Sequence, residues 1–479
     1  MEPRRASRAC DPCKRRKVRC NGQSRCQQCT HVGLPCTYAT GPVQRSRKKT
    51  VRRGTVIAEC RQGSQARNDH NPGRFLQPWS ASIEFPIQSS HPNPAFFLEF
   101  LDEYTEYVYP MSPVVPATEI RNLIAQMNEN REAASFAYIF IAVTINLTRS
   151  EPVQQAPATR ERIATFVTRS LEYRVPVGLS TQPNVIGVME NLFTQMCFVG
   201  LRRLDLGFSY LRQAISYVYM TLPTHSDEGL AALDVAERSR RQRAYYECFI
   251  HERFTALTFH RPTCLACLQN FPDHDPSLPE HVEEGFNLLI QSFCFVDRQF
   301  LDFALGDRSG VTVEWIQMKQ QELDDYDWHQ KVSELPELMQ ADLVITRHWL
   351  RTLTWQIALS NTLLSSSSTS LLLSLSFPLR LSSQLRQFLS AVPRDMVGIH
   401  GSGILEKLFE IANTITDVVL HLKHAPGDET VERVYDIMFL RDFIYSFPGF
   451  ETLRPAALTE KFEQIRSKYP GIKEIELLQ

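Results

Sequence analysis

Six cysteines within the first 36 residues constrain this 479-residue chain more than any other feature. The spacing C-x2-C-x6-C occurs twice, separated by five residues, and gives Cys10, Cys13, Cys20, Cys26, Cys29 and Cys36. Thiolates two residues apart can bind one metal ion from a single turn, as in structural zinc sites. Two tetrahedral zinc ions need eight ligand positions, which six cysteines supply only if two of them bridge both ions. The spacing therefore predicts a cluster of two zinc ions (Zn2+) and six cysteines.

The segment inside the first half-motif is strongly basic. Five of the six residues between the second and third cysteines are cations, namely Lys14, Arg15, Arg16, Lys17 and Arg19. The matching segment of the second half-motif, residues 30–35, contains no Lys, Arg, Asp or Glu. Two zinc ions and six thiolates carry a net charge of about −2, so that five cations exceed what is needed to offset the cluster. This asymmetry indicates that the first half-motif faces a polyanion.

Residues 7–38 resemble the DNA-binding domain of the fungal Zn2Cys6 (zinc-cluster) transcription factors. The run SRACDPCKRRKVRC, from Ser7 to Cys20, follows the first half of that domain closely. The loop at residues 21–25 departs from it, because it lacks the proline that many members carry before the fourth cysteine. This departure concerns the geometry of the loop and leaves the six cysteines in place.

The resemblance implies a role for each residue of the motif. The helix after the second cysteine is expected to enter the DNA major groove, where Lys17, with Arg16 beside it, reads a CGG triplet. Lys and Arg suit this task because they donate hydrogen bonds to the O6 and N7 acceptors of guanine. The other cations, Lys14, Arg15 and Arg19, are expected to contact phosphates, which position the protein without specifying sequence. The expected bridging ligands are Cys10 and Cys26.

Charge is divided unevenly along the chain. The whole chain has a formal net charge of −1, but residues 1–54 hold 15 Lys and Arg against two acidic residues. That segment carries +13, which leaves −14 for the remainder. A basic head joined to an acidic body is typical of a nucleic-acid module attached to a part that binds proteins or ligands.

Features that determine cellular location point to the nucleus. Met1–Ala9 is polar and basic, unlike a secretion signal, and the uncharged, apolar stretch Ala133–Leu147 is too short to span a bilayer. The scattered cysteines of the body suit a reducing compartment. Arg45–Arg53 resembles a nuclear import signal, and the same residues could also contact phosphates. We therefore expect a nuclear protein with no membrane segment.

Residues 39–92 have the composition of a flexible linker, basic at first and then rich in Gly, Ser, Gln, Asn and Pro. They contain no run of apolar residues at the a and d positions of a coiled coil. The coiled-coil dimerisation device of many zinc-cluster regulators is therefore not expected, and the sequence leaves open whether the chain is a monomer or a homodimer.

From residue 93 the apolar residues recur at helical spacing. Ala133–Leu147 reads as a buried helix, and one apolar face runs from Leu204 to Val218. A basic run within Glu237–Leu257 leads into apolar positions. The pattern from Leu405 to Leu422 favours bundle core over a dimer seam, because sustained coiled coils usually run longer. The body is therefore expected to be all-α.

The body also resembles the fungal regulatory (middle homology) region that accompanies zinc clusters. Ala236–Arg253, followed by Arg261-Pro262, is similar to the central signature of that region, and Phe97–Pro113 to its opening. The resemblance implies control of activity rather than catalysis. No nucleophile constellation, phosphate-binding glycine loop or paired carboxylates stand out, so that we do not expect an enzyme.

Three local features of the body have ordinary structural interpretations. Cys264 and Cys267 form a second C-x2-C pair without partners at metal spacing, and we expect two buried cysteines just past a helix end. The acidic and aromatic run Glu322–Trp328 is a solvated loop, a helix start or an activation segment. His251, inside an apolar helix, is expected to be a hydrogen-bonded core or boundary histidine rather than a ligand.

Together these features predict a small Zn2Cys6 binuclear zinc-cluster domain at 7–38, a flexible linker at 39–92 and a large all-α regulatory domain at 93–479. The expected function is sequence-specific transcription regulation, specific to one pathway such as a specialised-metabolite gene cluster. The expected partners are double-stranded DNA and the transcription machinery or regulatory proteins. The alternative is a zinc-stabilised module that binds an acidic protein partner. RNA is a third candidate, but the head offers only Tyr38 for stacking.

Overall fold

The computed structural model describes residues 9–16, 18–31, 35–38, 92–148, 156–175, 183–221, 233–365, 370–421, 427–447 and 455–469. They divide between two compact units, Met1–Ser89 and Ser90–Gln479. Apart from one isolated bridge between Ser365 and Ser374, the regular structure within these ranges is helical. The predicted fold class, a small cysteine-cluster domain and an all-α body, is confirmed. None of the helices described here is both long and apolar enough to cross a lipid bilayer.

The first unit contains two short helices, α1 (Asp11–Arg16) and α2 (Gln27–His31), within the cysteine-rich segment at residues 7–38, which is called the head below. The second unit, called the body, begins with α4 (Pro94–Leu98), α5 (Leu101–Glu103), the π-helix η1 (Tyr104–Val108), α6 (Ala117–Gln126), α7 (Arg131–Thr148), α8 (Ala156–Tyr173), α9 (Val185–Gly200) and α10 (Leu204–Thr221). It continues with α12 (Val235–Phe259), α13 (Glu280–Cys294), α14 (Arg298–Ala304), α15 (Val313–Glu322), α16 (Tyr326–Ser333) and α17 (Glu337–Ser360). The last elements are the 3-10 turn η2 (Leu371–Leu373), α18 (Phe377–Ala391), α19 (Arg394–Gly398), α20 (Gly401–His421), α21 (Gly427–Tyr445) and α22 (Pro455–Lys468).

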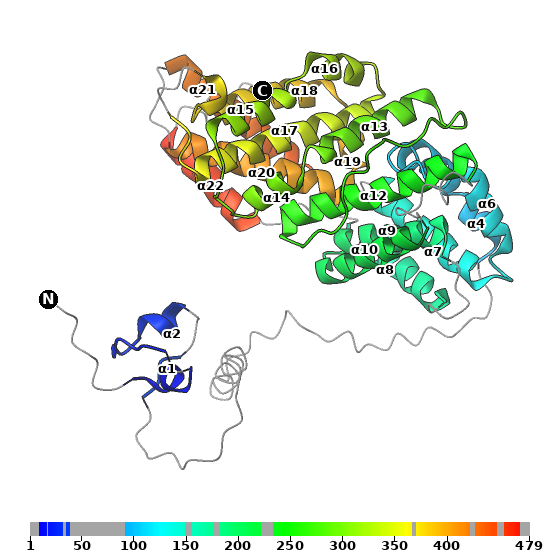
Figure 1. Cartoon of the computed structure of the whole chain (residues 1–479), viewed down its shortest axis with the longest axis horizontal. Helices are drawn as coiled ribbons and strands as arrows, with labels where there is room; N and C mark the ends of the chain where they lie inside the picture. The colour runs from blue at the N-terminus through cyan, green and yellow to red at the C-terminus, as the bar shows by residue number, and fades with distance from the viewer. Residues whose placement is uncertain are drawn as a thin grey trace, which may run out of the picture. The chain divides into compact units, whose positions relative to one another are not determined.

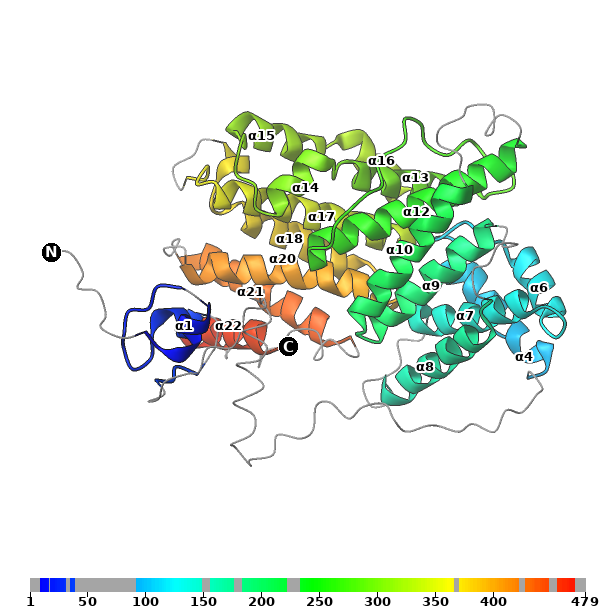
Figure 2. The ribbon, with the colours of Figure 1, turned by 60° about the horizontal axis from the view of Figure 1, so that its bottom comes forward.

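Two groups of helices in the body are joined through α12. In the first group α9 packs against α7 and α10, and α7 also packs against α8. In the second group α17 and α20 lie side by side in both Figures 1 and 2, and α18, α21 and α22 surround α20. Helix α12 contacts α9 and α10 on one side and α13 and α14 on the other. The long helix that the sequence placed at Glu237–Leu257 therefore connects the two groups.

Helix boundaries in the body follow ordinary capping chemistry. Asp234, Asp297 and Thr312 each accept a hydrogen bond from the backbone N–H three residues later, at the first turns of α12, α14 and α15. Asp325 likewise caps α16. The acidic and aromatic run Glu322–Trp328 thus extends from the last residue of α15 to the first turn of α16, where Trp328 is buried, which favours the structural interpretation of that segment.

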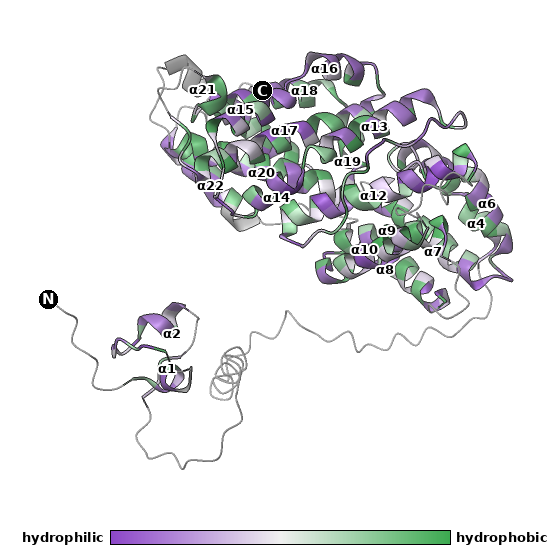
Figure 3. Ribbon diagram, in the orientation of Figure 1, coloured by the Kyte–Doolittle hydropathy of each residue, from purple (hydrophilic) through white to green (hydrophobic). Residues whose placement is uncertain are grey.

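The predicted apolar faces lie in one continuous core. Residues 133–145 of α7 are buried without interruption, as expected for Ala133–Leu147. Leu211, Ile215 and Val218 of α10 are also buried. In α20 the buried set includes Leu405, Leu408, Ala412, Ile415 and Val419, so that this face is used within the body and not as a dimer seam. Figure 3 shows both hydrophobic and hydrophilic sides on the helices of the body.

The cysteines around residue 264 differ from the prediction. Cys267 forms a disulfide with Cys294 at the end of α13, and Cys264 is exposed. The expectation of two buried, unpaired cysteines was therefore wrong. A pairing over 27 residues brings together a loop and a helix end that no local spacing relates.

Helix α17 buries several polar side chains, among them His348. The His348 Nδ1–H donates to the Val344 carbonyl oxygen at 2.9 Å, and Nε2 has no hydrogen-bond partner within the part of the chain that the structure describes. Burial lowers the pKa of His348 to about 4, and the hydrogen bond to Val344 opposes this shift only in part. Arg347, Arg351 and His329 lie near enough to disfavour the charged imidazole further. The folded body therefore holds this histidine neutral.

We expect the body to lose stability as the pH falls from about 6.5 to 4. In that range His348 is protonated in the unfolded chain but stays neutral in the folded body, because its pKa is lower in the folded state than in the unfolded state. The loss from one such histidine is on the order of 3 kcal/mol at most. His348→Asn should flatten the pH dependence of the urea-unfolding free energy. Asn retains a donor to the carbonyl four residues earlier, as Asn191 has in α9. An unchanged slope would show that other groups cause the acid sensitivity.

Candidate zinc cluster and nucleic-acid interface

The two helices of the head present the cysteines to one another. Cys13 lies on α1 and Cys29 on α2, while Cys10 and Cys26 immediately precede these helices. Pro12 and Asp11 in the first turn of α1 favour a helix start at that point. Cys10, Cys13, Cys26 and Cys29 are fully buried, and Cys20 and Cys36 are partly buried. The duplicated half-motif thus folds into two similar helix starts around one cysteine cluster.

The six sulfur atoms fall into two groups of four. One group is Cys10, Cys13, Cys20 and Cys26, and the other is Cys10, Cys26, Cys29 and Cys36. Within each group the Sγ atoms lie within 4.8 Å of one another. The groups share Cys10 and Cys26, which are the two residues expected to bridge.

The sulfur spacing fits tetrahedral zinc. Zn–S bonds of about 2.3 Å at tetrahedral angles place neighbouring sulfurs roughly 3.8 Å apart. The Cys10 Sγ lies 3.6 Å from Cys26 Sγ, 3.5 Å from Cys29 Sγ and 3.8 Å from Cys20 Sγ. Cys13 Sγ is 3.5 Å from Cys26 Sγ. The donor set suits two zinc ions held by six thiolates.

Backbone groups support the sulfurs and close the head. The N–H groups of Cys26, Cys29 and Gly22 donate to the Sγ atoms of Cys36, Cys26 and Cys20 at 3.3–3.4 Å. Gly22 has φ of 71°, a left-handed conformation that glycine adopts readily. Such N–H donors favour the thiolate form of a ligand and orient it.

The residues after Cys36 are hydrogen-bonded to α1 and to the loop between the two half-motifs. The Asp11 N–H donates to the Thr37 carbonyl at 2.8 Å, and the Tyr38 hydroxyl donates to the Gln23 carbonyl at 2.7 Å. The sequence interpretation did not identify this contact, and Tyr38 entered it only as a stacking candidate. With its hydroxyl bonded inside the head, Tyr38 has a structural role.

The structure places the basic run on α1 and the segment that follows it. Lys14 lies on α1 with an exposed side chain, and Arg19 is exposed just before the third cysteine. Arg15 and Arg16 occupy the last turn of α1 as far as the backbone is described, and Lys17 lies outside the described residues. Helix α2 carries no Lys or Arg. The positive charge is therefore concentrated on the first half of the head.

Comparison with known proteins identifies the head. Residues 8–46 match the fungal Zn(2)-Cys(6) binuclear cluster domain, which binds two zinc ions. The match includes all six cysteines and the whole basic run.

Comparison along the whole chain gives regulators. A maltose fermentation regulatory protein of Saccharomyces cerevisiae is 23% identical over 90% of this chain and 89% of its own length. A probable sucrose utilization protein of Candida albicans is 22% identical over 90% of this chain and 83% of its own length. The AAl-toxin cluster-specific transcription factor of Alternaria alternata is 24% identical over 48% of this chain and 37% of its own length.

The head matches a zinc-cluster domain, and the relatives that align with both head and body are regulators. Together these matches indicate the functional class of the protein. The protein is a DNA-binding transcription regulator and not an enzyme. It carries the fungal Zn2Cys6 binuclear cluster domain at residues 8–46, followed by an all-helical body.

Proposed function

We propose that this regulator recognises CGG-type triplets in double-stranded DNA through residues 7–38 and acts in the nucleus. The supporting observation is the position of the basic run, which occupies α1 and the residues before Cys20 beside a cluster whose other half carries no such charge. In this proposal Lys17 and Arg16 contact guanine, and Lys14, Arg15 and Arg19 contact phosphates. Residues 39–92 link the head to a regulatory body at 93–479.

Within this proposal Cys10 and Cys26 would be ligands of both zinc ions. Cys13 and Cys20 would complete the site of one ion, and Cys29 and Cys36 that of the other. Zinc fixes the head, since a segment this short cannot build a hydrophobic core, and metal binding supplies the folding free energy. The chain's own residues supply the DNA contacts. An exposed cation on α1, such as Lys14, can reach a phosphate only when the cluster holds α1 in place.

We further propose that the protein controls one pathway. The relatives that align with nearly the whole chain are named for maltose and sucrose use, which favours a carbon-source pathway. The toxin-cluster factor aligns with half of the chain and keeps a specialised-metabolite cluster as the second candidate. Transcription machinery or regulatory proteins are the proposed partners of the body.

Selection from a randomised duplex pool by the zinc-loaded, full-length protein tests the DNA proposal. We expect CGG triplets to be enriched, and paired triplets would indicate a homodimer on DNA. If Lys14, Arg15 and Arg19 each neutralise one phosphate, affinity should fall about 40-fold between 50 and 200 mM salt. Salt-sensitive binding without sequence preference would contradict base reading by this head. An absence of any duplex binding would contradict the DNA proposal and favour the alternative, a zinc-stabilised module that binds an acidic protein partner.

Lys17→Ala should abolish the preference for CGG while leaving the zinc content unchanged. Loss of a bidentate guanine contact is worth about 1–3 kcal/mol of discrimination, or roughly 5- to 150-fold. Lys14→Ala is the matched control, because loss of a phosphate contact should weaken all sequences alike and reduce the salt slope by about 1. The measurement is affinity for a CGG duplex and for a scrambled duplex at two salt concentrations. A Lys17→Ala protein that still prefers CGG would refute the assignment.

A further inference from the structure

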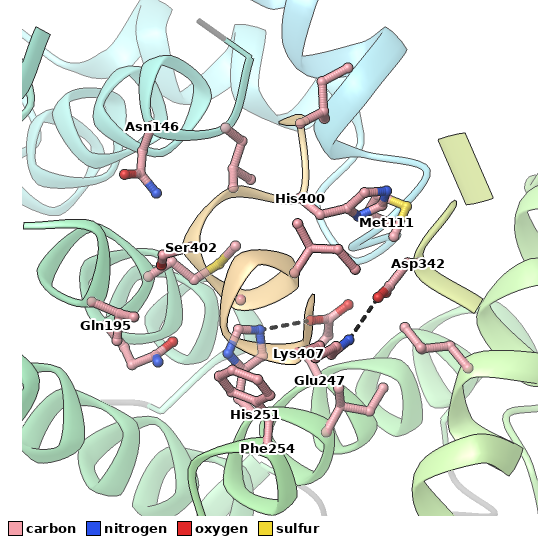
Figure 4. Close-up of a pocket in the computed structure, with 18 of the residues that line it drawn as sticks. Met111, Asn146, Gln195, Glu247, His251, Phe254, Asp342, His400, Ser402 and Lys407 are labelled. Carbon is pink, nitrogen blue, oxygen red and sulfur yellow. Dashed lines mark hydrogen bonds and ion pairs between the residues drawn. The ribbon is translucent and has the colours of Figure 1, made fainter. Parts of the chain in front are cut away.

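A cavity of about 150 Å³ lies inside the body where the two groups of helices meet (Figure 4). Helices α7 and α9 form one side, α17 and α20 the other, and α12 and α13 contribute the remaining wall. Most of the lining is apolar, including Met196, Phe254 and Phe293. A cavity of this volume can hold a molecule about the size of benzene.

Two polar groups on the cavity wall are buried without a partner. These are the side chains of Glu247 on α12 and Gln195 on α9. Both residues line the cavity, and each is 4% exposed. Among the described residues, Glu247 Oε1 and Gln195 Oε1 have no partner at hydrogen-bonding distance, and the Ser112 hydroxyl lies near the Glu247 carboxyl. His251 Nε2 lies 4.0 Å from the other carboxyl oxygen of Glu247. Buried acceptors are normally paired, so that these two indicate a missing donor.

The charges around the cavity already balance. The Lys407 ammonium donates to Asp342 Oδ1 at 2.8 Å and to Thr346 Oγ1 at 2.6 Å. Burial raises the pKa of Glu247 to about 8, against the opposite effect of the Ser112 hydroxyl, so that its carboxyl is mostly neutral at pH 7.

The remaining titratable groups on the cavity wall are also neutral at pH 7. Burial lowers the pKa of His251 to about 4 and also lowers that of His400. A hydrogen bond with Glu106 raises the pKa of Tyr107. A charged ligand would lose its hydration here without finding a counter-charge.

We propose that this cavity binds a small uncharged organic molecule, with an apolar ring-sized body and one or two hydroxyl or N–H groups that donate to Glu247 and Gln195. The mostly apolar wall disfavours a ligand rich in hydroxyls. Because both groups of helices line the cavity, the ligand would contact each of them. Neither the ligand nor its site depends on DNA recognition by the head.

Phenol and toluene are the probes, because they share a ring and differ in one hydroxyl group. Calorimetric titration of the full-length, zinc-loaded protein should give one saturable site for phenol, with affinity at least about fivefold higher than for toluene. Benzoate and benzylammonium, which carry a charge on the same ring, should bind at least tenfold more weakly than phenol. Equal binding of either ion, or no saturable phenol site, would overturn the proposal.

Gly403→Leu tests the location. A Cβ atom added at Gly403, in the first turn of α20, would meet only the Phe254 ring at an ordinary 3.9 Å. The leucine side chain can therefore occupy the cavity, and we expect an unchanged or higher melting temperature together with at least a tenfold loss of phenol affinity. Unchanged phenol affinity in the folded variant would place the site elsewhere and overturn the proposal.

Glu247→Met tests the polar contact independently of cavity filling. The substitution keeps an unbranched side chain of similar length and removes the acceptor. We expect the preference for phenol over toluene to disappear while toluene affinity changes by less than twofold. Retention of the preference would show that Glu247 does not accept from the ligand. This comparison also keeps the proposal testable if Gly403→Leu fails to fold.

Discussion

Cys10→Ser should remove both zinc ions from the head and reduce DNA affinity by at least about 1,000-fold, to the level of non-specific binding or below. Cys10 belongs to both groups of four sulfurs, so that its loss leaves neither group with four cysteine ligands. Because zinc supplies the folding free energy of so short a segment, residues 9–38 should unfold. The body should keep its helical circular dichroism, since it forms a separate compact unit with its own core.

Cys36→Ser is the comparison that makes this prediction specific. Cys36 belongs to one group only, and its loss leaves Cys10, Cys13, Cys20 and Cys26 intact. We expect about one zinc ion per chain in Cys36→Ser, almost none in Cys10→Ser and two in the exposed body variant Cys264→Ser. Native mass spectrometry and zinc analysis of the purified chains measure these contents. Equal zinc contents in Cys10→Ser and Cys36→Ser would contradict shared ligation.

The sequence predicted those features that depend on residues close together in the chain. The repeated C-x2-C-x6-C spacing alone predicted a shared cluster, because short spacings within one turn determine which sulfurs can meet. The apolar faces of α10 and α20 were predicted for the same reason, since helical periodicity acts over a few residues. Both predictions depend on contacts within one element or between adjacent elements.

The features that the sequence did not predict arise from partners far apart in the chain. The disulfide joins Cys267 to Cys294, and no periodic pattern relates them. The cavity depends on Gln195, Glu247 and Lys407, which come from three helices. A local signal did exist, because Glu247 and Lys407 interrupt otherwise apolar positions and are buried. Helical periodicity shows that such a polar residue lies on an apolar face, but it does not predict which distant residue contacts it.

The basic run of α12 illustrates the same limit. Four arginines between residues 238 and 243 could be taken from the sequence as another surface for anions, but each is paired within the body. Arg240 pairs with Glu119 and bonds to the Val114 carbonyl, and Arg238 pairs with Asp273. Three of the four, Arg238, Arg240 and Arg243, therefore attach α12 to segments more than 30 residues away. Arg241 instead pairs with Glu237 within α12 and donates to the Thr221 carbonyl. All four are engaged within the body.

Arg243 is the most buried of the four, and we expect its replacement by alanine to cost about 3–5 kcal/mol of unfolding free energy. Its side chain is 6% exposed and that of its partner Asp275 is 4% exposed. The guanidinium donates to Asp275 Oδ2 at 3.0 Å, to the Pro113 carbonyl at 2.7 Å and to Ser239 Oγ at 2.8 Å. Alanine would leave a buried carboxylate and a buried carbonyl without this donor.

The pKa of Asp275 gives the pH dependence of this contribution. Burial alone would raise that pKa, but hydrogen bonds from Ser277 and Arg243 outweigh burial and hold it below its usual value. A carboxyl with a depressed folded pKa stabilises the protein above its unfolded pKa, near 3.9, and the contribution disappears as the pH falls. The penalty of Arg243→Ala should therefore be full at pH 7 and smaller near pH 3.

Urea unfolding followed by the fluorescence of the buried body tryptophans measures the effect, with Arg298→Ala as the control. Arg298 pairs with Asp302 at 3.9 Å but is 95% exposed, so that its loss should cost at most about 0.5 kcal/mol. Arg243→Lys should recover only part of the stability, because an ammonium cannot reproduce the planar fork that serves three acceptors. Arg243→Met combined with Asp275→Leu should recover more than either single change, since the pair is then replaced by apolar groups. If Arg243→Ala costs no more than Arg298→Ala, the buried pair does not hold α12 in place.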